Sequence, residues 1–547
     1  MMREKIDMAI AAALRVCVGI SGDTDFSVAP PENPEHWDYA TNVALLLAKP
    51  LKKNPMDVAR TLELGMRNQE LWTTEIVAPG FINFLLKPGV LHDGLKMILS
   101  EKETFGKVDF GKGKKARVEY VSANPTGPMH IGNARGGPIG EVIARVLEKS
   151  GYEVLREYIH NDAGTQVEKM GATLWYWYRK ALGEEGEFPE GGYQGEYLGE
   201  VADAALRIEG RSLDLARLTT FGLDYIYREN MDVVHRMGIK FDLVRRESEL
   251  LSFGKTAEAI EKIKQEGVTK EYDGALWFEV APLDQSIDQY MVSGSQDTVV
   301  VRSTGQPTYF ASDIAYHKEK FESGYDLVID VFGSNHHGHV PKLQALTKIF
   351  GFDPTHFTVV LYQYVRVKRG AEVVKMSKRA GTYVTAKEVL DEVGADALNF
   401  FLLMHAPGTH MDFDLELAKQ ETQQNPVYYI QYAHARCASI LKNAGIRNQE
   451  LGIRDFDLLK EKEELDLIKK MLRIPEVIED TAHDFQVQRI PHYALDLARA
   501  FHHFYETHRV ITEDAPLTAT RLELVRATQM TLKNTLALMS IDAPDKM

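Results

Sequence analysis

Cysteine is almost absent from this 547-residue chain, which contains only Cys17 and Cys437. Two cysteines cannot build a disulfide framework or a cysteine-rich zinc site, and such usage is typical of a reducing compartment, so we expect a cytoplasmic protein. Long apolar runs are absent as well, since no stretch approaches the ~20 residues that span a bilayer. The partly apolar N-terminal stretch carries Glu4, Asp7 and Arg15, which favours an amphipathic helix over a signal peptide. We therefore expect no membrane contact.

Positively charged residues are also fewer than negatively charged ones. Lys and Arg number 64 against 79 Asp and Glu, so the net charge is −15, and composition alone favours a small-molecule enzyme over a nucleic-acid-binding protein. Local charge can differ from net charge, and basic residues gather at 112–117 and 366–369 as two candidate patches. The hydrophobic share of 44% and the charged share of 26% are typical of a globular protein. The length exceeds what one hydrophobic core can hold, which predicts three or four domains.

The most informative stretch covers residues 118–151. It begins as a strand at 118–121, because β-branched and aromatic residues suit a pleated surface. The cluster 124–128, with two prolines and a glycine, breaks that strand. Apolar residues then recur at helical spacing from position 139 to 147, and Gly151 ends the helix. Strand, turn and helix in this order predict the first half of a nucleotide-binding βαβ unit, whose helix N-terminus suits a phosphate.

Two short motifs carry the chemistry. The turn of the βαβ unit reads HIGN at 130–133, and KMSKR follows far downstream at 375–379. Alone, the first would be an ordinary βα turn with a solvent-facing histidine, and the second a lysine-rich surface loop. Together and in this order they resemble the HIGH and KMSKS signatures of class I aminoacyl-tRNA synthetases. Asn133 stands where the family has its second signature histidine, and an asparagine donates a hydrogen bond but cannot carry charge.

The resemblance implies attack of an amino-acid carboxylate on the α-phosphate of ATP, a reaction catalysed by positioning and charge stabilisation. The implied catalytic residues are His130, Asn133, Lys375 and Lys378. The implied ATP-binding residues are Pro128, His130, Gly132, Asn133, Met376, Ser377 and Lys378. ATP would enter as its Mg²⁺ complex, and we expect no protein-bound structural metal. The histidines at 336–339 have no interleaved carboxylate or cysteine as co-ligand, so we expect a polar loop that lines the pocket.

The rest of this region continues an α/β pattern. The near-continuous apolar run at 327–332 is typical of a parallel strand covered on both faces. A mainly helical insertion at about 165–300 interrupts the sheet, and its aromatic run at 175–178 favours a buried helix face over base stacking. We expect a helix at 313–322, opened by Asp313. The other strands that we expect lie at 152–159, 298–302, 308–310 and 357–362.

The segment YFASDIAYH at 309–317 makes the resemblance more specific, because it is similar to the arginyl-tRNA synthetase segment that carries a substrate-binding tyrosine and aspartate. The implied arginine-binding residues are Glu119, Ser122, Asn124, Tyr309, Asp313 and His336. Since an arginine side chain is a planar cation with five donors, carboxylates such as Asp313 and Glu119 meet it well. Tyr309 would contact the guanidinium, while Ser122 and Asn124 would hold the α-amino and carboxylate groups. The alternative for Asp313, from its position alone, is a helix N-cap or first-turn carboxylate.

Three domains follow from this reading. A small α+β domain occupies residues 1–110, a class I Rossmann-like catalytic domain with a parallel sheet occupies 115–405, and a helical bundle occupies 420–547. The motif DYATN at 38–42 resembles the tRNA-contacting N-terminal domain of arginyl-tRNA synthetases, although a scaffold role is the alternative. Apolar stripes at helical spacing in the last region, with LDLARAF at 495–501, resemble the family's anticodon-binding bundle.

We therefore expect an arginine–tRNA ligase that forms arginyl-adenylate and transfers the arginyl group to the 3′ adenosine of tRNA. The implied partners are tRNA, L-arginine and ATP, and the resemblance implies a monomer that needs bound tRNA for activation. Two alternatives stay open: a class I synthetase for another basic amino acid, and a catalytically impaired tRNA-binding paralogue. Asn133 and Asn399, which replaces a frequent family arginine, keep the second alternative open. A small-molecule nucleotidyltransferase would not explain the C-terminal bundle.

Overall fold

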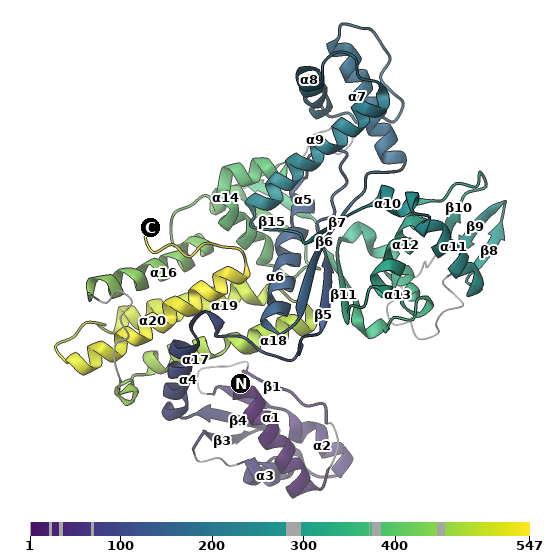
Figure 1. Ribbon diagram of the computed structural model, residues 1–547. Helices are drawn as coiled ribbons and strands as arrows, with labels where there is room; N and C mark the ends of the chain where they lie inside the picture. Colours follow the sequence, from purple (N-terminus) through teal and green to yellow (C-terminus); the bar gives the residue numbers. More distant parts are fainter. Residues whose placement is uncertain are drawn as a thin grey trace.

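The computed structural model describes residues 2–20, 24–31, 37–66, 70–279, 297–370, 372–374, 384–445 and 455–547 (Figure 1). A small α+β domain, a central α/β domain and a C-terminal helical bundle follow one another along the chain, so the predicted fold class is confirmed. In these ranges, every helix is too short or too polar to cross a lipid bilayer.

The N-terminal domain combines helices with one antiparallel sheet of order β1-β2-β4-β3. The expected amphipathic helix is confirmed as α1 (Met2–Ala13), which buries Ile6 and Ile10 one turn apart. The other elements of the domain are η1 (Leu14–Val18), β1 (Val28–Ala29), β2 (Tyr39–Thr41), α2 (Val43–Leu51), α3 (Pro55–Met66), β3 (Trp72–Val77) and β4 (Phe81–Leu86). Helices α4 (Pro88–Glu101) and η2 (Lys102–Thr104) lead into the central domain.

The motif at 38–42 joins the N-terminal domain to the helical bundle. The Tyr39 hydroxyl donates to Glu476 Oε1 at 2.7 Å, and Lys469 Nζ lies 3.0 Å from Asp38 Oδ1. These partners belong to α17 (Lys462–Leu472) and α18 (Ile474–Asp484) of the bundle. Two side chains of the motif therefore hold two domains together.

The central domain is built on a five-stranded parallel sheet of order β12-β11-β5-β6-β7. The strands are β5 (Lys115–Glu119), β6 (Glu153–His160), β7 (Leu243–Arg246), β11 (Leu327–Gly333) and β12 (Phe357–Tyr362). Chain order reverses between β5 and β11, so the ligand-binding switch point of such a sheet lies at the carboxyl ends of these two strands.

Helix α6 (Gly136–Lys149) covers the sheet and confirms the helix expected after the first signature. Gly140 lies so close to Tyr120 that a Cβ atom on it would sit 2.1 Å from the tyrosine Cγ. Because residue 140 has no side chain, the helix can lie directly against the segment that follows β5. Gly151, just beyond the helix, has the positive φ of 89° that favours glycine.

Two expectations for the region before β11 are wrong. Residues 308–310 form no strand, because helix α12 (Tyr309–Glu322) begins there, with Thr308 as its N-cap. Thr, Tyr and Phe all favour strands, but burial of Phe310 and Ile314 one turn apart favours the helix. Strand β10 (Thr298–Val301) does form, but it pairs with β9 (Ala275–Phe278) in a separate antiparallel sheet of order β10-β9-β8.

The expected insertion is not continuous, because β7 inside it belongs to the central sheet. Before β7, helices α7 (Thr165–Ala181), α8 (Tyr197–Glu209) and α9 (Leu215–Arg236) project from the sheet at the top of Figure 1. Tyr178, in the aromatic run, is buried in their core. After β7 come α10 (Glu247–Ser252), α11 (Lys255–Gln265) and β8 (Thr269–Tyr272).

The second expected basic patch is neutralised by ion pairs, and the first loses Arg117 to the interior. Arg117 is buried, and its Nε donates to Glu157 Oε2 at 2.6 Å, so it is no part of a surface patch. In the second patch, Arg366 Nε lies 2.7 Å from Asp412 Oδ1, and Arg369 Nη1 lies 2.7 Å from Glu392 Oε1. Opposite charges that are near in space, although far apart in the sequence, account for the difference.

The remaining elements complete the central domain and form the bundle, at the left of Figure 1. The apolar stripe predicted around Leu497 and Phe501 is confirmed as buried core. The central elements are α5 (Ile131–Ala134), η4 (Ser334–His339), α13 (Val340–Ile349), η5 (Pro354–His356), β13 (Val365–Arg369), β14 (Glu372–Val373), α14 (Ala386–Leu403), β15 (Met411–Asp414) and α15 (Leu415–Ala418). The bundle adds α16 (Pro426–Asn443), η6 (Phe456–Leu458), α19 (Arg489–Thr507) and α20 (Ala515–Leu538) to α17 and α18.

Candidate active site

A cavity of about 740 Å³ opens at the carboxyl ends of β5, β6 and β11, where the sheet topology predicts a ligand site. It gathers side chains from segments between Glu119 and Tyr364, far apart in the sequence. The predicted site residues that line it are Glu119, Ser122, Asn124, His130, Gly132, Asn133, Tyr309, Asp313 and His336. Pro128 is not among the lining residues. The second signature, with Lys375, Met376, Ser377 and Lys378, lies outside the described residues.

The end of β5 is shaped by an unusual backbone. Val121 and Ser122 have positive φ values of 69° and 37°, a conformation that costs free energy for residues with a side chain. The Ser122 hydroxyl donates to Glu119 Oε1 at 2.8 Å and accepts from the Ile159 backbone N–H at 3.2 Å. The serine thus fixes the Glu119 carboxylate at the cavity wall.

A chain of amides extends from this wall. Asn161 Nδ2 donates to Asn124 Oδ1 at 3.0 Å, and Asn124 Nδ2 donates to Gln166 Oε1 at 3.1 Å. All three side chains line the cavity. Asn161 and Gln166 were not predicted from the sequence, although Asn161 directly follows the second strand of the sheet, where ligand-binding residues are expected.

The first signature turn begins helix α5. His130 is the N-cap, and its Nδ1 accepts a hydrogen bond from the Asn133 backbone N–H at 3.2 Å. The backbone on either side of His130 pairs with residues that follow the second signature: Ile131 N donates to Val384 O at 3.3 Å, and Ala386 N donates to Met129 O at 2.8 Å. One flank of the second signature is therefore fixed beside the first.

Arg135, just after the signature, is fully buried. Its guanidinium donates to the backbone carbonyls of Gln363 and Thr409, both at 2.8 Å, and of Ala406 at 3.0 Å. Burial lowers the pKa of Arg135 to about 10, so the side chain keeps its charge at neutral pH. This cation connects the signature helix to the β12–β13 and α14–β15 connections.

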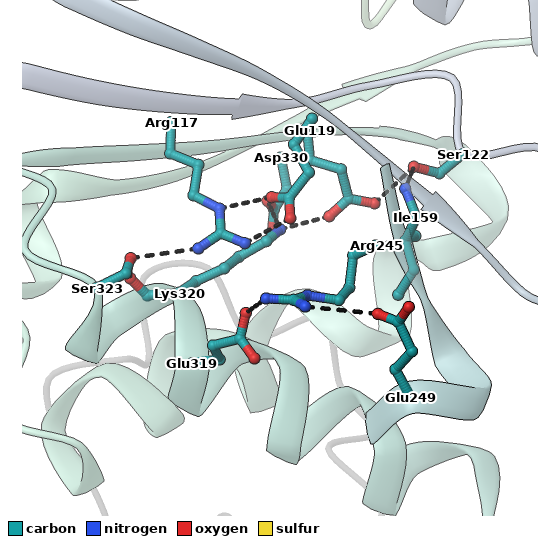
Figure 2. Close-up of polar contacts among 11 residues, drawn as sticks. Arg117, Glu119, Ser122, Ile159, Arg245, Glu249, Glu319, Lys320, Ser323 and Asp330 are labelled. Carbon is teal, nitrogen blue, oxygen red and sulfur yellow. Dashed lines mark hydrogen bonds and ion pairs between the residues drawn. The ribbon is translucent and has the colours of Figure 1, made fainter. Parts of the chain in front are cut away.

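Four carboxylates line the cavity: Glu168, which is exposed, and three that are buried or half-buried. Glu119 is only 2% exposed, and it accepts hydrogen bonds from Lys320 and Ser122 (Figure 2). Burial raises the pKa of Glu119, and the charge of Lys320 opposes that shift. Asp313 is in the second turn of α12, where its side chain is 20% exposed and lies 3.7 Å from His339 Nδ1. The N-cap alternative for Asp313 is therefore wrong, because Thr308 occupies that position.

The third carboxylate, Glu247, was not predicted from the sequence. It begins α10 at the carboxyl end of β7, is 4% exposed and lines the cavity. The pKa of Glu247 is raised to about 7, mainly by burial and then by the charge of Asp313. A hydrogen bond from Ser312 lowers the pKa in part. Within the described part of the chain, Glu247 Oε2 has no hydrogen-bond partner. Recognition of β7 as a sheet strand would have drawn attention to the residue that follows it.

Tyr309 and His336 also line the cavity. Tyr309 is partly exposed at the cavity; the surrounding protein, followed by the charges of Asp313 and Glu247, raises the pKa of its phenol, which stays neutral. Burial and the neighbouring His339 lower the pKa of His336. A neutral tyrosine, a neutral histidine and several carboxylates form a site that attracts a cation with hydrogen-bond donors.

Comparisons with known proteins cover the whole chain. The model described as "Arginyl tRNA synthetase N terminal domain" matches residues 2–86, "tRNA synthetases class I (R), catalytic domain" matches 94–187 and 196–404, and "DALR anticodon binding domain" matches 430–547. The chain is 41% identical to the Arginine–tRNA ligase of Caldanaerobacter subterraneus subsp. tengcongensis, over 96% of this chain and 94% of that protein. It is also 41% identical to the Arginine–tRNA ligase of Desulforudis audaxviator, over 100% and 99%.

Solved structures share the fold. The arginyl-tRNA synthetase of Thermus thermophilus superimposes with a TM-score of 0.79 at 23% identity and covers 100% of both chains. The enzyme of Plasmodium falciparum gives a TM-score of 0.77 at 18% identity, over 100% of this chain and 99% of that one. At these identities the likeness establishes the architecture of the chain rather than its chemistry.

Proposed function

The chain belongs to the class I arginyl-tRNA synthetase family, and on that premise we propose that it joins L-arginine to tRNA through an arginyl-adenylate. The observation that supports this proposal best is the cavity at the switch point, which brings the signature turn and an anionic wall together. It therefore acts as an aminoacyl-tRNA ligase that uses ATP, L-arginine and tRNA. Full-length similarity to arginine–tRNA ligases disfavours both alternatives, a class I synthetase for another basic amino acid and a catalytically impaired tRNA-binding paralogue.

At the amino-acid end, we assign the guanidinium to Asp313 and Glu247, with Tyr309 against its face or edge. The buried Glu247 oxygen needs a donor, and a guanidinium offers two parallel N–H groups to a carboxylate. Glu119, Ser122 and Asn124 line the cavity at and just after the end of β5, and we assign them to the α-amino and α-carboxylate groups. His336 supplies a neutral polar contact.

At the ATP end, we assign the phosphates to the signature turn. The bond that His130 Nδ1 accepts from Asn133 N places the imidazole proton on Nε2, which we propose donates to the α-phosphate. Gly132, Asn133 and Pro128 would hold the nucleotide around this turn. From the family resemblance, Lys375 and Lys378 would stabilise the charge that develops on the phosphate, with Met376 and Ser377 beside them.

Magnesium belongs to the substrate in this proposal. ATP would carry Mg²⁺ between its phosphates, where it neutralises charge. Over the described ranges of the chain, no group of three or more His, Cys, Asp or Glu side chains is arranged to hold a metal ion. The chain's own contribution is to orient the α-carboxylate of arginine towards the α-phosphate and to exclude water from the reacting atoms.

We also propose that tRNA contacts the N-terminal domain and the helical bundle, and that its binding precedes activation of arginine. The enzyme would act as a cytoplasmic monomer without membrane contact. The test is ATP–pyrophosphate exchange with each standard amino acid, with and without uncharged tRNA. Exchange with arginine alone, dependent on tRNA, would support the whole proposal. Exchange with a different amino acid would overturn the substrate assignment, and bound tRNA without any exchange would indicate an impaired paralogue.

A further inference from the structure

A buried cluster of charges adjoins the cavity through Glu119, which lines the cavity and belongs to the cluster shown in Figure 2. Lys320 has 0% exposure, and its ammonium donates to Glu119 Oε2 on β5 and to Asp330 Oδ1 on β11, the latter at 2.5 Å. It also lies 4.3 Å from the centre of the Tyr316 ring. One ammonium therefore forms ion pairs with two buried carboxylates from neighbouring strands.

Helix α12 carries both the cavity residues and this ammonium. Tyr309, Asp313, Tyr316 and Lys320 follow one another at intervals of four, three and four, so they lie on one helix face. The first three line the cavity, and Lys320 extends the same stripe beyond them. The position of Lys320 relative to Glu119 is therefore rigidly coupled to that of Tyr309 and Asp313.

The bonds around Glu119 are complete and specific. Oε1 accepts from the Ser122 hydroxyl at 2.8 Å, while Oε2 accepts from Lys320. Asp330 in turn bonds His317 Nε2 at 2.9 Å, and His317 Nδ1 bonds the Asp313 carbonyl at 2.8 Å. Although burial raises the pKa of Asp330, the charge of Lys320 and the bond with His317 lower it to about 2. The network links the end of β5 to the second turn of α12.

We propose that Lys320 is a positioning residue for amino-acid binding, which holds the Glu119 carboxylate in its orientation and supplies the charge that keeps it ionised. This inference rests on the proposed use of Glu119 to bind arginine. Lys320 itself does not line the cavity, so it acts through Glu119 rather than by touching the substrate. Without the ammonium, a carboxylate so deeply buried would retain its proton and lose its attraction for a cation.

The groups that face Lys320 come from every neighbouring element. They are Glu119 and Arg117 on β5, Glu157 on β6, Asp330 on β11, and Tyr316 and His317 on α12 itself. Arg117 is already paired with Glu157, so this neighbouring pair cannot replace the Lys320 ammonium. Although burial lowers the pKa of Lys320, the charges of Asp330 and Glu119 outweigh that effect and raise it.

The experiment compares Lys320→Met, which removes the charge, with Lys320→Arg, which keeps it. The matched control is Lys318→Met on the same helix, where Nζ lies 2.7 Å from Glu322 Oε2 at the surface. KM for arginine and KM for ATP are measured in tRNA-dependent ATP–pyrophosphate exchange between pH 6 and 9, roughly the range in which buried carboxylates with raised pKa values titrate. Thermal unfolding monitors the fold.

We expect Lys320→Met to raise KM for arginine by about 10- to 100-fold, the effect of losing a charged hydrogen bond, with KM for ATP nearly unchanged. In this variant KM for arginine should continue to fall towards high pH, because Glu119 must lose its proton first, while the wild-type value levels off. Lys320→Arg should recover most of the affinity, and Lys318→Met should behave as wild type.

A folded Lys320→Met enzyme with wild-type KM for arginine would overturn the inference, as would an equal loss for both substrates without recovery in Lys320→Arg. If Lys320→Met does not fold, the double variant Lys320→Met/Asp330→Asn removes one charge of each sign and is tested in the same way. Absence of arginine-dependent exchange in the wild type would instead contradict the proposed function, so the two failures are distinguishable.

Discussion

Glu119 and Glu247 lie at the carboxyl ends of two strands of one sheet and are almost equally buried, at 2% and 4% exposure. Their surroundings differ. Both oxygens of Glu119 accept hydrogen bonds from the protein, whereas Glu247 Oε2 has no partner in the described part of the chain. Burial raises the pKa of both carboxylates, that of Glu247 to about 7. A carboxylate whose two oxygens both accept hydrogen bonds from the protein is already stabilised. A carboxylate with an unbonded oxygen beside a cavity is suited to a cationic ligand.

The largest effect should come from replacing Glu247, whose Oε2 has no hydrogen-bond partner in the described part of the chain. We expect Glu247→Gln to lower kcat/KM for arginine by roughly 100- to 1000-fold, because a charged hydrogen bond to the guanidinium is lost and a neutral amide replaces it. The measurement is tRNA-dependent ATP–pyrophosphate exchange, and the control is Glu249→Gln on the same helix, whose carboxylate pairs with Arg245 at 3.5 Å. Equal activity of the two variants would remove Glu247 from the substrate site.

Removing one partner of a buried ion pair should instead lower the free energy of unfolding. Arg117→Met leaves Glu157 buried without its cation, and we expect a loss of about 3–5 kcal/mol in the free energy of unfolding. Urea denaturation at pH 7 measures it. The matched control, Arg366→Met, disrupts an exposed pair with Asp412 and should cost about 0–1 kcal/mol. Similar losses for both variants would contradict the distinction between buried and surface pairs.

The pKa of Glu247 sets the sign of a pH effect on stability. Because this pKa is about 7 in the folded chain and 4.5 in the reference state, the folded state binds more protons between these values. Stability relative to Glu247→Gln should therefore fall as pH rises from 4.5 to 7, by roughly 3 kcal/mol in total. Urea denaturation of both proteins across pH 5–8 tests this, and a difference that is constant with pH would refute it.

The smallest expected effect concerns Ser122, whose hydroxyl donates a hydrogen bond to the Glu119 carboxylate. Ser122→Ala removes the 2.8 Å bond to Glu119 and leaves the Ile159 N–H without its acceptor. We expect KM for arginine to rise by about fivefold to tenfold, the loss of a single neutral donor, because Lys320 still holds the carboxylate. Ser252→Ala, at an exposed position of α10, is the control in the same exchange assay. An effect as large as that of Glu247→Gln would contradict the ranking.

The sequence predicted much of this architecture. The family and fold class are confirmed, and so are the strands at 327–332 and 357–362, because apolar runs and a signature turn are local features. Residues 308–310 were predicted as a strand because local propensity favours one, yet burial of one helix face decides the structure. Nine described site residues line one cavity, while their individual roles stay a prediction.

Glu247 and Lys320 were not selected from the sequence for a different reason. Each is a charged residue on an ordinary amphipathic helix, where charges are usually solvated. Only the tertiary arrangement buries them, Glu247 at the cavity and Lys320 between two strands. Asn399 shows the same limit: its amide donates to the Met237 carbonyl at 2.9 Å, so this departure from the family pattern lies in a buried contact between helices.

Arg135 has a consequence for how this enzyme can diverge. Because its guanidinium binds only main-chain oxygens, the side chains at 363, 405, 406 and 409 contribute nothing to these four bonds. Tolerance to substitution should therefore differ between the two sides of these bonds: a saturation library should accept varied residues at the four acceptor positions, subject to packing, and almost none at 135. The geometry beside the first signature would then depend on one side chain, Arg135, while the sequences of the connections that Arg135 binds can vary.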